Sequence, residues 1–346
     1  MNALASTVSP TPGYGSDQDG LVWGYVFLSG QPPRPVECPD ARQHLSEFVE
    51  DADRDGFIWL HFSLANAASE RWMRNTLSLP DSFYDALHTN TGATRLEVED
   101  NLLVAVIHDV LIDSTFDASK VSTVTLCLGP RLVVSARLRP LRSVDHLRAA
   151  VKNGYSLRSS AELLAHLLRD QADVLGDIVR QATGRVDEIE DTLLDNRLSM
   201  TRGELSAMRR AQVRLQRLLA PETAAMFRLL NRSPAWLKEA DVADLRQAAE
   251  EFSAAVLDSV ALTERLKLLQ EELVATVNEH TNRTLFVLTV VTVLALPINV
   301  VAGLFGMNVG GVPLAQHSQG FALVVGALAI VTLGLCWFLL LRRRRD

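Results

Sequence analysis

The chain has 346 residues, of which 48% are hydrophobic and 22% are charged, and its formal net charge is -7 at pH 7. This acidic balance argues against a general affinity for nucleic acid. The three cysteines (Cys38, Cys127 and Cys336) are far apart and form no CxxC or CxxH unit, which argues against a disulfide framework and a structural zinc knuckle.

Residues 1–20 predict a flexible N-terminal tail. The stretch is rich in Ser, Pro and Gly, and it has neither the basic start nor the apolar centre of a secretory signal peptide.

The sequence pattern of residues 21–142 predicts a cytoplasmic α/β domain. Short runs of Val, Ile, Leu and aromatic residues are typical of strands. They are Leu21–Leu28, Gly56–Leu64, Leu102–Leu111, Val121–Leu128 and Leu132–Leu138, the last two separated by Gly129 and Pro130 as in a hairpin. Ala67–Leu77 and Asp81–Leu87 are expected to be helices that pack on the sheet.

Residues 143–240 predict cytoplasmic helices, because strand signals disappear and helical spacing begins. The expected helices are Asp145–Lys152, Leu157–Leu194 and Arg202–Leu230. A stalk helix follows over 241–284, within a helical pattern that continues from Asp241 to Leu304. Its apolar seam, which includes Leu245, Phe252 and Leu266, needs a partner, either another part of this chain or another copy.

Two uncharged apolar runs, 285–305 and 321–341, are each long enough to cross a bilayer as a helix. They predict a transmembrane hairpin joined by an external loop over 306–320 and followed by a basic tail over 342–346. The loop contains no Lys, Arg, Asp or Glu, whereas Arg283 precedes the first span and Arg342–Arg345 follows the second. The positive-inside rule then places both termini in the cytoplasm of a multi-pass protein of the cell (inner) membrane. An anionic-lipid or nucleic-acid patch is the alternative explanation of the arginine run, and its position at a span edge favours topology.

The junction after the first span carries the tripeptide Gly306-Met307-Asn308, preceded by Pro297, the pair Ala302-Gly303 and Phe305. With the two-span hairpin and the long helix before it, this pattern resembles the CorA superfamily of divalent-cation transporters. Gly310–Pro313, in a loop without carboxylates, is similar to the ZntB zinc-transporting branch. The resemblance implies an α+β membrane protein that forms a funnel-shaped homo-oligomer, a pentamer in the family.

Two spans cannot enclose an aqueous path, so a pore requires several copies. If the first span lines the axis, one face of it meets the ion, and leucine rings on that face could gate by dewetting. The residues expected to line the pore are Asn282, Leu285, Leu288, Thr289, Thr292, Leu296 and Asn299.

Gly306, Met307 and Asn308 are the expected selectivity filter, with Asn308 as the metal-contacting residue. The Gly306 carbonyl and the Asn308 amide would form a neutral oxygen ring, which suits a cation that keeps much of its hydration shell. Gly and Asn also commonly end helices, so a helix C-cap is the structural alternative, and both can hold together.

Four further residues are candidates for cation or proton sites: Glu271, Glu279, His280 and His317. Histidine titrates near neutral pH, so His317 in the loop or His280 near the cytoplasmic mouth could bind zinc or relay protons. Solvent-exposed side chains without such a role are the alternative for all four.

No Walker loop, GxSxG or HExxH motif occurs, so neither an enzyme nor a bound cofactor is expected. The expected function is transport of divalent metal cations, with zinc uptake as the first hypothesis and proton coupling left open; Mg²⁺, Co²⁺, Ni²⁺ and Cd²⁺ are further candidate ions. The alternatives are a magnesium, cobalt or nickel channel of the CorA type and a non-transporting, membrane-anchored sensor.

Overall fold

The computed structural model describes residues 15–50, 55–88, 94–111, 121–194, 202–307 and 319–343. Contacts divide the chain into two units, Met1–Leu269 and Gln270–Asp346. The boundary falls inside helix α7 (Glu239–Phe305). The division of the sequence at residues 142, 240 and 284 stays a prediction.

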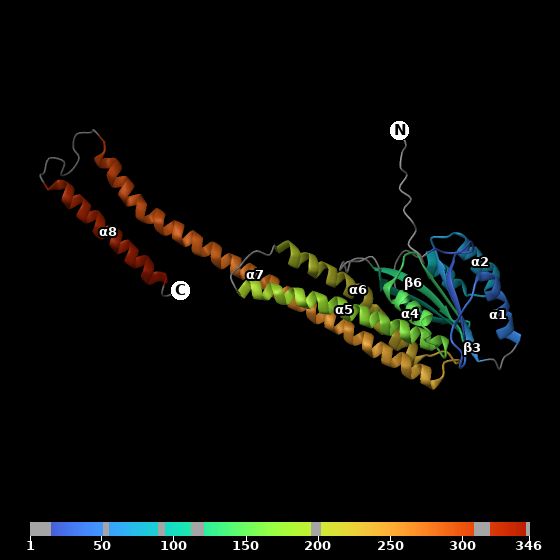
Figure 1. Cartoon of the computed structure of the whole chain (residues 1–346). Helices are drawn as coiled ribbons and strands as arrows, with labels where there is room; N and C mark the ends of the chain where they lie inside the picture. Colours follow the sequence, from blue (N-terminus) through green and yellow to red (C-terminus); the bar gives the residue numbers. More distant parts are fainter. Residues whose placement is uncertain are drawn as a thin grey trace, which may run out of the picture. The chain divides into compact units, whose positions relative to one another are not determined.

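A seven-stranded sheet lies between helices of the first unit, in the order β2-β1-β3-β7-β6-β5-β4 (Figure 1). The strands are β1 (Leu21–Leu28), β2 (Arg34–Pro35), β3 (Gly56–Ser63), β4 (Arg95–Glu99), β5 (Leu102–Val110), β6 (Val121–Leu128) and β7 (Leu132–Arg137). Neighbouring strands are antiparallel, except that β3 and β7 are parallel. The predicted hairpin between β6 and β7 is confirmed.

The strong apolar runs gave the right strands, with β1 and β6 at their predicted bounds. The structure adds three elements that the sequence pattern did not predict: β2, β4 and helix α1 (Cys38–Glu50). β4 alternates charged residues with Leu96 and Val98 and has one strand neighbour, β5, so it lacks the apolar run of a central strand.

Helices cover both faces of the sheet. On one face, α1 packs with α2 (Ala68–Thr76) and α3 (Asp81–His88) around a core that includes Ile58, Leu60 and Phe62 of β3. The alternate β3 residues point to the other face, where α4 (Arg142–Lys152) lies and its Arg148 guanidinium stands 4.4 Å from the Trp23 ring centroid.

Three long helices complete the first unit: α5 (Ser160–Leu194), α6 (Arg202–Asn231) and the start of α7 (Figure 1). The seam residues Leu245, Phe252 and Leu266 are buried within the single chain. The partner of this part of the seam is therefore the chain itself.

Hydrogen bonds at both ends of α5 hold it beside α7. Ser159 Oγ donates to Asp241 Oδ1 at 2.7 Å near the start of α7. Further along, Arg265 Nε donates to Glu190 Oε1 at 2.8 Å, and the same guanidinium lies 2.7 Å from Asp187 Oδ1. The two helices therefore run side by side in the same direction.

Side chains from α5 and α6 replace a missing strand beside β5. The β4–β5 ladder ends at the pair Arg95–Val106, so the backbone of His108 has no strand partner on that side within the part of the chain that the structure describes. Its N–H donates to Glu222 Oε1 of α6 at 2.5 Å, and its carbonyl accepts from Gln171 Nε2 of α5. Gln171 Nε2 also donates to Glu222 Oε2 at 2.8 Å. Glu222 is fully buried, and burial raises the pKa of its carboxyl.

A second buried carboxyl, Asp109 on β5, holds the start of α4. Asp109 accepts hydrogen bonds from the Ser143 N–H at 2.9 Å, the Ser143 hydroxyl at 2.8 Å and the Val110 N–H at 2.7 Å. Burial outweighs these hydrogen bonds and raises the pKa of Asp109 to about 6.

The second unit contains the end of α7 and helix α8 (Gly320–Arg343). Both helices are long and apolar enough to cross a membrane. Their large side chains, among them Leu288, Leu296, Ile330 and Trp337, are exposed in the single chain, so lipid or another copy must cover them.

Glu222→Ala should destabilise the protein strongly, because it leaves the His108 N–H buried without an acceptor and opens a cavity. The expected loss is about 3 kcal/mol, which lowers the apparent Tm of the detergent-solubilised protein by about 10 °C. Asp173→Ala, at an exposed position of α5, is the control and should change little. Equal melting temperatures for the two variants would contradict this role of Glu222.

Asp109 should make stability depend on pH in a defined window. Because its folded pKa of about 6 lies above the ordinary 3.8, the folded state prefers the neutral carboxyl. The free energy of unfolding should therefore fall as pH rises from about 4 to about 6, by roughly 3 kcal/mol, and then stay level. Melting curves of wild type and Asp109→Asn across this range test the prediction, since only the wild type has the Asp109 carboxyl that titrates. Parallel pH profiles for the two proteins would show that Asp109 does not titrate there.

Candidate cation path along helix α7

The residues predicted to line a pore share one face of α7. α7 is continuous through Phe305, and successive residues of a helix turn by roughly 100°. On this spacing the seven residues fall within roughly a third of the circumference. They are Asn282, Leu285, Leu288, Thr289, Thr292, Leu296 and Asn299, and all seven are exposed in the single chain.

The two threonines on this face bond to their own helix. Thr289 Oγ1 donates to the Leu285 carbonyl at 2.8 Å, and Thr292 Oγ1 donates to the Leu288 carbonyl at 2.8 Å. A threonine bonded in this way can face lipid at low cost, so the hydroxyl protons do not by themselves require a polar surrounding. Their oxygens still have lone pairs that a passing cation or water can meet.

Asn299 differs from these threonines. Its amide is exposed, it lies in the apolar part of α7, and it has no hydrogen-bond partner among the described residues. An amide has two donor protons and two acceptor lone pairs, and leaving them unmet in hydrocarbon costs several kcal/mol. Asn299 therefore requires water or another polar group beyond the described residues.

Helix α7 ends at the Gly-Met-Asn motif. The Gly306 N–H donates to the Ala302 carbonyl at 2.9 Å, which continues the helical bonding to the motif itself and fits the capping role of this glycine. Met307 is exposed. Asn308 and His317 lie outside the described residues, so their predicted roles stay predictions.

The candidate sites nearer the first unit do not share one face of α7. Glu271, Glu279 and His280 are all exposed. On the helical spacing Glu271 falls on the same face as Thr292, whereas Glu279 and His280 fall on other sides of the helix. Of these three, the geometry brings only Glu271 into line with the proposed path.

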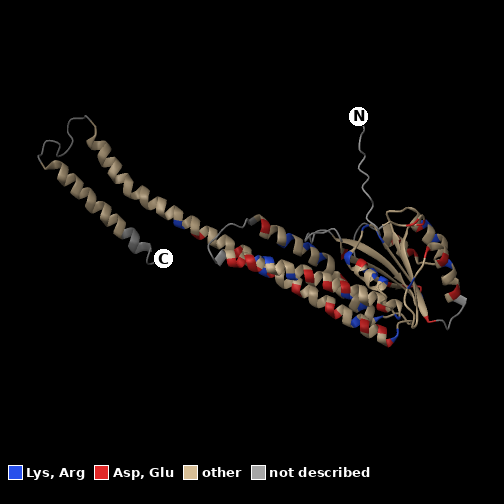
Figure 2. Cartoon of the chain, in the orientation of Figure 1, with Lys and Arg blue, Asp and Glu red and all other residues tan. Residues whose placement is uncertain are grey.

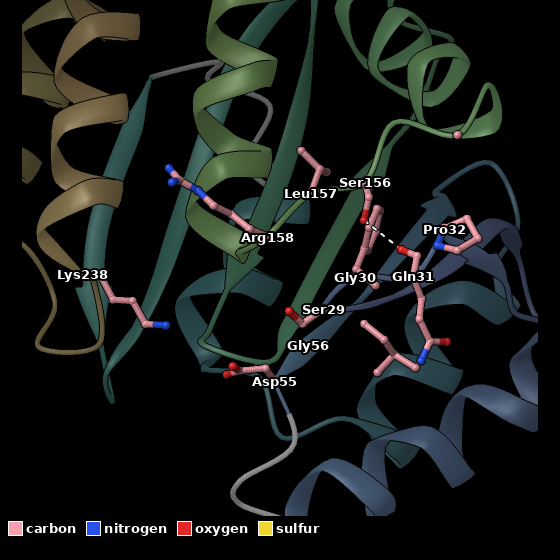
Figure 3. A pocket seen from close by; sticks show the side chains of 13 residues that line it. Ser29, Gly30, Gln31, Pro32, Asp55, Gly56, Ser156, Leu157, Arg158 and Lys238 are labelled. Carbon is pink, nitrogen blue, oxygen red and sulfur yellow. Dashed lines mark hydrogen bonds between the residues drawn. The ribbon is translucent and has the colours of Figure 1, made fainter.

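The first unit has a cleft of about 580 Å³ at one end of the sheet (Figure 3). Its charged lining residues are Asp55, Arg158 and Lys238, and the Ser156 hydroxyl donates to the Gln31 carbonyl across it at 3.1 Å. Arg158 is already paired with Asp244 and Glu162. No histidine or cysteine lines this cleft.

The residues that the structure describes contain no group of three His, Cys, Asp or Glu side chains that could hold a metal ion. A path lined by amide, hydroxyl and carbonyl oxygens suits a cation that passes through better than a cation that is bound tightly.

Sequence reasoning missed the buried cluster of His108, Gln171 and Glu222 and the charged residues of the cleft. These side chains come together from segments as far as 114 residues apart in the chain. No local pattern marks them, because each one alone looks like an ordinary polar residue of a strand or helix.

Three comparisons with known proteins bear on this site. A family model described as "CorA-like Mg2+ transporter protein" matches residues 54–344. The divalent cation transporter CmaX of Pseudomonas aeruginosa is 27% identical over 320 residues, which cover 90% of this chain and 94% of that protein. The zinc transport protein ZntB of Pectobacterium atrosepticum is 24% identical over 281 residues, which cover 81% of this chain and 86% of that protein.

The solved structure of full-length CmaX matches with a TM-score of 0.79 and 25% identity. The match covers 94% of this chain and 99% of that structure, so it includes the sheet and the C-terminal helix pair. Because the family model and this structure cover nearly the whole chain, the protein belongs to the CorA-like family and is a membrane transporter of divalent cations rather than an enzyme.

Proposed function

We propose that this protein carries zinc across the membrane through a pore at the centre of a homo-oligomer, with α7 lining the pore. The observation that carries the proposal is the exposed Asn299 amide, which has no hydrogen-bond partner among the described residues and lies in a mostly apolar stretch of α7. Water in a shared pore satisfies this amide, and a single two-span chain cannot enclose water.

Several copies around one axis would bring the Asn299 face of each α7 together. The rings of Leu285, Leu288 and Leu296 on the same face would then be narrow, apolar constrictions between the polar rings. Five copies is the number that the family resemblance implies. Both termini would lie in the cytoplasm, and the membrane potential would favour inward movement of a divalent cation.

Zinc is proposed over magnesium for two reasons. ZntB, a zinc transport protein, is among the relatives. No acidic side chain occurs between Arg283 and Arg342, so the part of the path within the membrane lacks the carboxylates that hard cations favour. Magnesium transport remains the second candidate, because the matched family model carries that ion in its description.

The proposed filter at Gly306, Met307 and Asn308 would add carbonyl and amide oxygens at the outer mouth. Proton coupling would involve His317 or His280, the histidines nearest the two ends of the path in sequence.

Replacing Asn299 by Leu should reduce zinc flux at least about tenfold, because a leucine ring at this level would exclude water from the path. Ile298→Leu, on a different side of the same helix, is the matched control and should keep its flux. Flux into proteoliposomes is measured together with the size of the assembly by native mass spectrometry. Normal flux in Asn299→Leu would remove this face of α7 from the pore.

Zinc selectivity and proton coupling can be measured in the same vesicles. With zinc or magnesium outside and a dye for each ion inside, zinc uptake should exceed magnesium uptake. An imposed inward proton gradient should increase zinc uptake if coupling operates. Equal or greater magnesium flux would assign the protein to magnesium transport, and zinc flux that ignores the pH gradient would exclude coupling. No flux of either ion from assembled protein would contradict the whole proposal.

A further inference from the structure

Among the described residues up to Leu269, seven large hydrophobic side chains are exposed. They are Val98, Leu138, Tyr155, Val213, Phe227, Leu257 and Leu268. Four of the seven lie on outward faces of only two helices, α6 and α7. Exposed apolar side chains that gather on one face of a helix are typical of surfaces that pack against another protein.

The outward face of α6 is apolar and basic. Val213, Ala220, Ala224 and Phe227 recur at spacings of 7, 4 and 3 residues, so they line one side of the helix, and all four are exposed. Four exposed arginines border them: Arg210, Arg214, Arg217 and Arg228. None of these arginines has an acidic partner among the described residues.

The outward face of α7 is apolar and acidic. Its exposed apolar residues are Ala254, Leu257, Ala261 and Leu268, again at helical spacings of 3, 4 and 7 residues. Glu250, Asp258 and Glu264 border them, while Arg246 stands before the face and Lys267 lies at its edge. Glu264 contacts only Lys267, at 3.8 Å, and Glu250 and Asp258 have no basic partner in the described chain.

We propose that the α6 face of one copy packs against the α7 face of the next copy. The proposal rests on the proposed function, which requires several copies around one axis. Each of the two faces has a central apolar line, and the two are opposite in charge. Figure 2 shows how basic and acidic residues are distributed along the helices. Pairing α6 with α6 would set arginines against arginines, and pairing α7 with α7 would set carboxylates against carboxylates.

An interface between two different surfaces has a definite geometric consequence. Each copy offers one α6 face and one α7 face, so each copy can bind two neighbours, head to tail. Such a heterologous contact generates a ring when the rotation closes. A closed ring is the arrangement that a central pore requires.

A groove of about 710 Å³ continues the α6 surface onto the edge of the sheet. It is lined by Leu96, Glu97 and Val98 of β4 and by Arg228, Leu229, Asn231 and Arg232 at the end of α6. The exposed Val98 therefore adjoins the same basic surface. Apolar contacts would supply most of the affinity here, while the charges set the partner and the register.

Charge reversal tests the pairing. Arg214→Glu with Arg217→Glu should lower the fraction of assembled protein at least tenfold in native mass spectrometry, and so should Glu250→Arg with Asp258→Arg. Combining all four substitutions makes the substituted parts of the two faces opposite in charge again and should restore assembly. Arg71→Glu with Arg139→Glu, at exposed arginines outside both faces, is the matched control and should assemble as wild type. Normal assembly of either one-sided variant, or failure of the combined variant to assemble although its Tm equals that of wild type, would overturn the proposal.

Crosslinking gives an independent test. In a Cys336→Ala background, chains with Val213→Cys are co-expressed with chains with Leu257→Cys and treated with a flexible bis-maleimide. The remaining cysteines, Cys38 and Cys127, are buried. Crosslinked dimers should form in the mixture and not from either variant alone. Equal dimer formation from one variant alone, or none in the assembled mixture, would overturn the proposal.

Assembly and zinc flux are measured on the same samples, so the two proposals can fail separately. If wild-type protein carries no zinc and the charge pattern of assembly still holds, the function fails and the interface stands. If wild type carries zinc and charge reversal leaves assembly unchanged, the interface fails and the function stands.

Discussion

The Asn299 amide is the group on which the functional argument depends. It lies exposed in the mostly apolar C-terminal stretch of α7, and no described residue of the chain offers it a hydrogen bond. In a bilayer such a group must meet water or a polar partner, and one hairpin of two helices cannot keep water around it. The need of this amide for water or a polar partner is therefore an argument that several copies assemble. The threonines on the same face add oxygens to such a path but do not demand it, since their hydroxyls already bond to the helix backbone.

The first unit also contains buried polar groups that need hydrogen-bond partners. β5 continues past the point where β4 begins, so on that side the backbone of His108 has no strand partner among the described residues, although β6 pairs with it on the other side. Glu222 and Gln171 take the place of the strand, and because they come from α6 and α5 they also fix the helices to the sheet. Arg265 then joins α7 to α5 through Asp187 and Glu190. A chain of buried and half-buried polar contacts thus connects the sheet to α7, although each contact taken alone looks like local stabilisation.

Periodic features could be predicted from the sequence, and features that depend on contacts between distant segments could not. Strands such as β1 and β6 can be recognised by their runs of β-branched and aromatic residues. The face of α7 that contains Asn299 follows from helical spacing alone. β4 was missed because an edge strand with charged alternate residues resembles a loop. The Glu222 cluster was missed because its members are distant in sequence. The periodicity of the α7 seam predicts that it packs against a partner but does not identify the partner. In the structure, the part of the seam from Leu245 to Leu266 is buried by the same chain.

The absence of charge in the hairpin bears on how ions could be told apart. From Leu285 to Leu341 there is no carboxylate or ammonium group, so the proposed path has neutral oxygens and sulfur to offer, with His317 as the one imidazole of this segment. Zinc prefers nitrogen and sulfur ligands, and an oxygen path binds it weakly. Weak binding is an advantage in transport, because an ion that binds tightly leaves slowly. Magnesium gives up its water reluctantly, so leucine rings between polar rings of the proposed pore would hinder it more than an ion that exchanges its water readily. On this argument selectivity arises from the cost of dehydration at apolar constrictions rather than from a dedicated metal site.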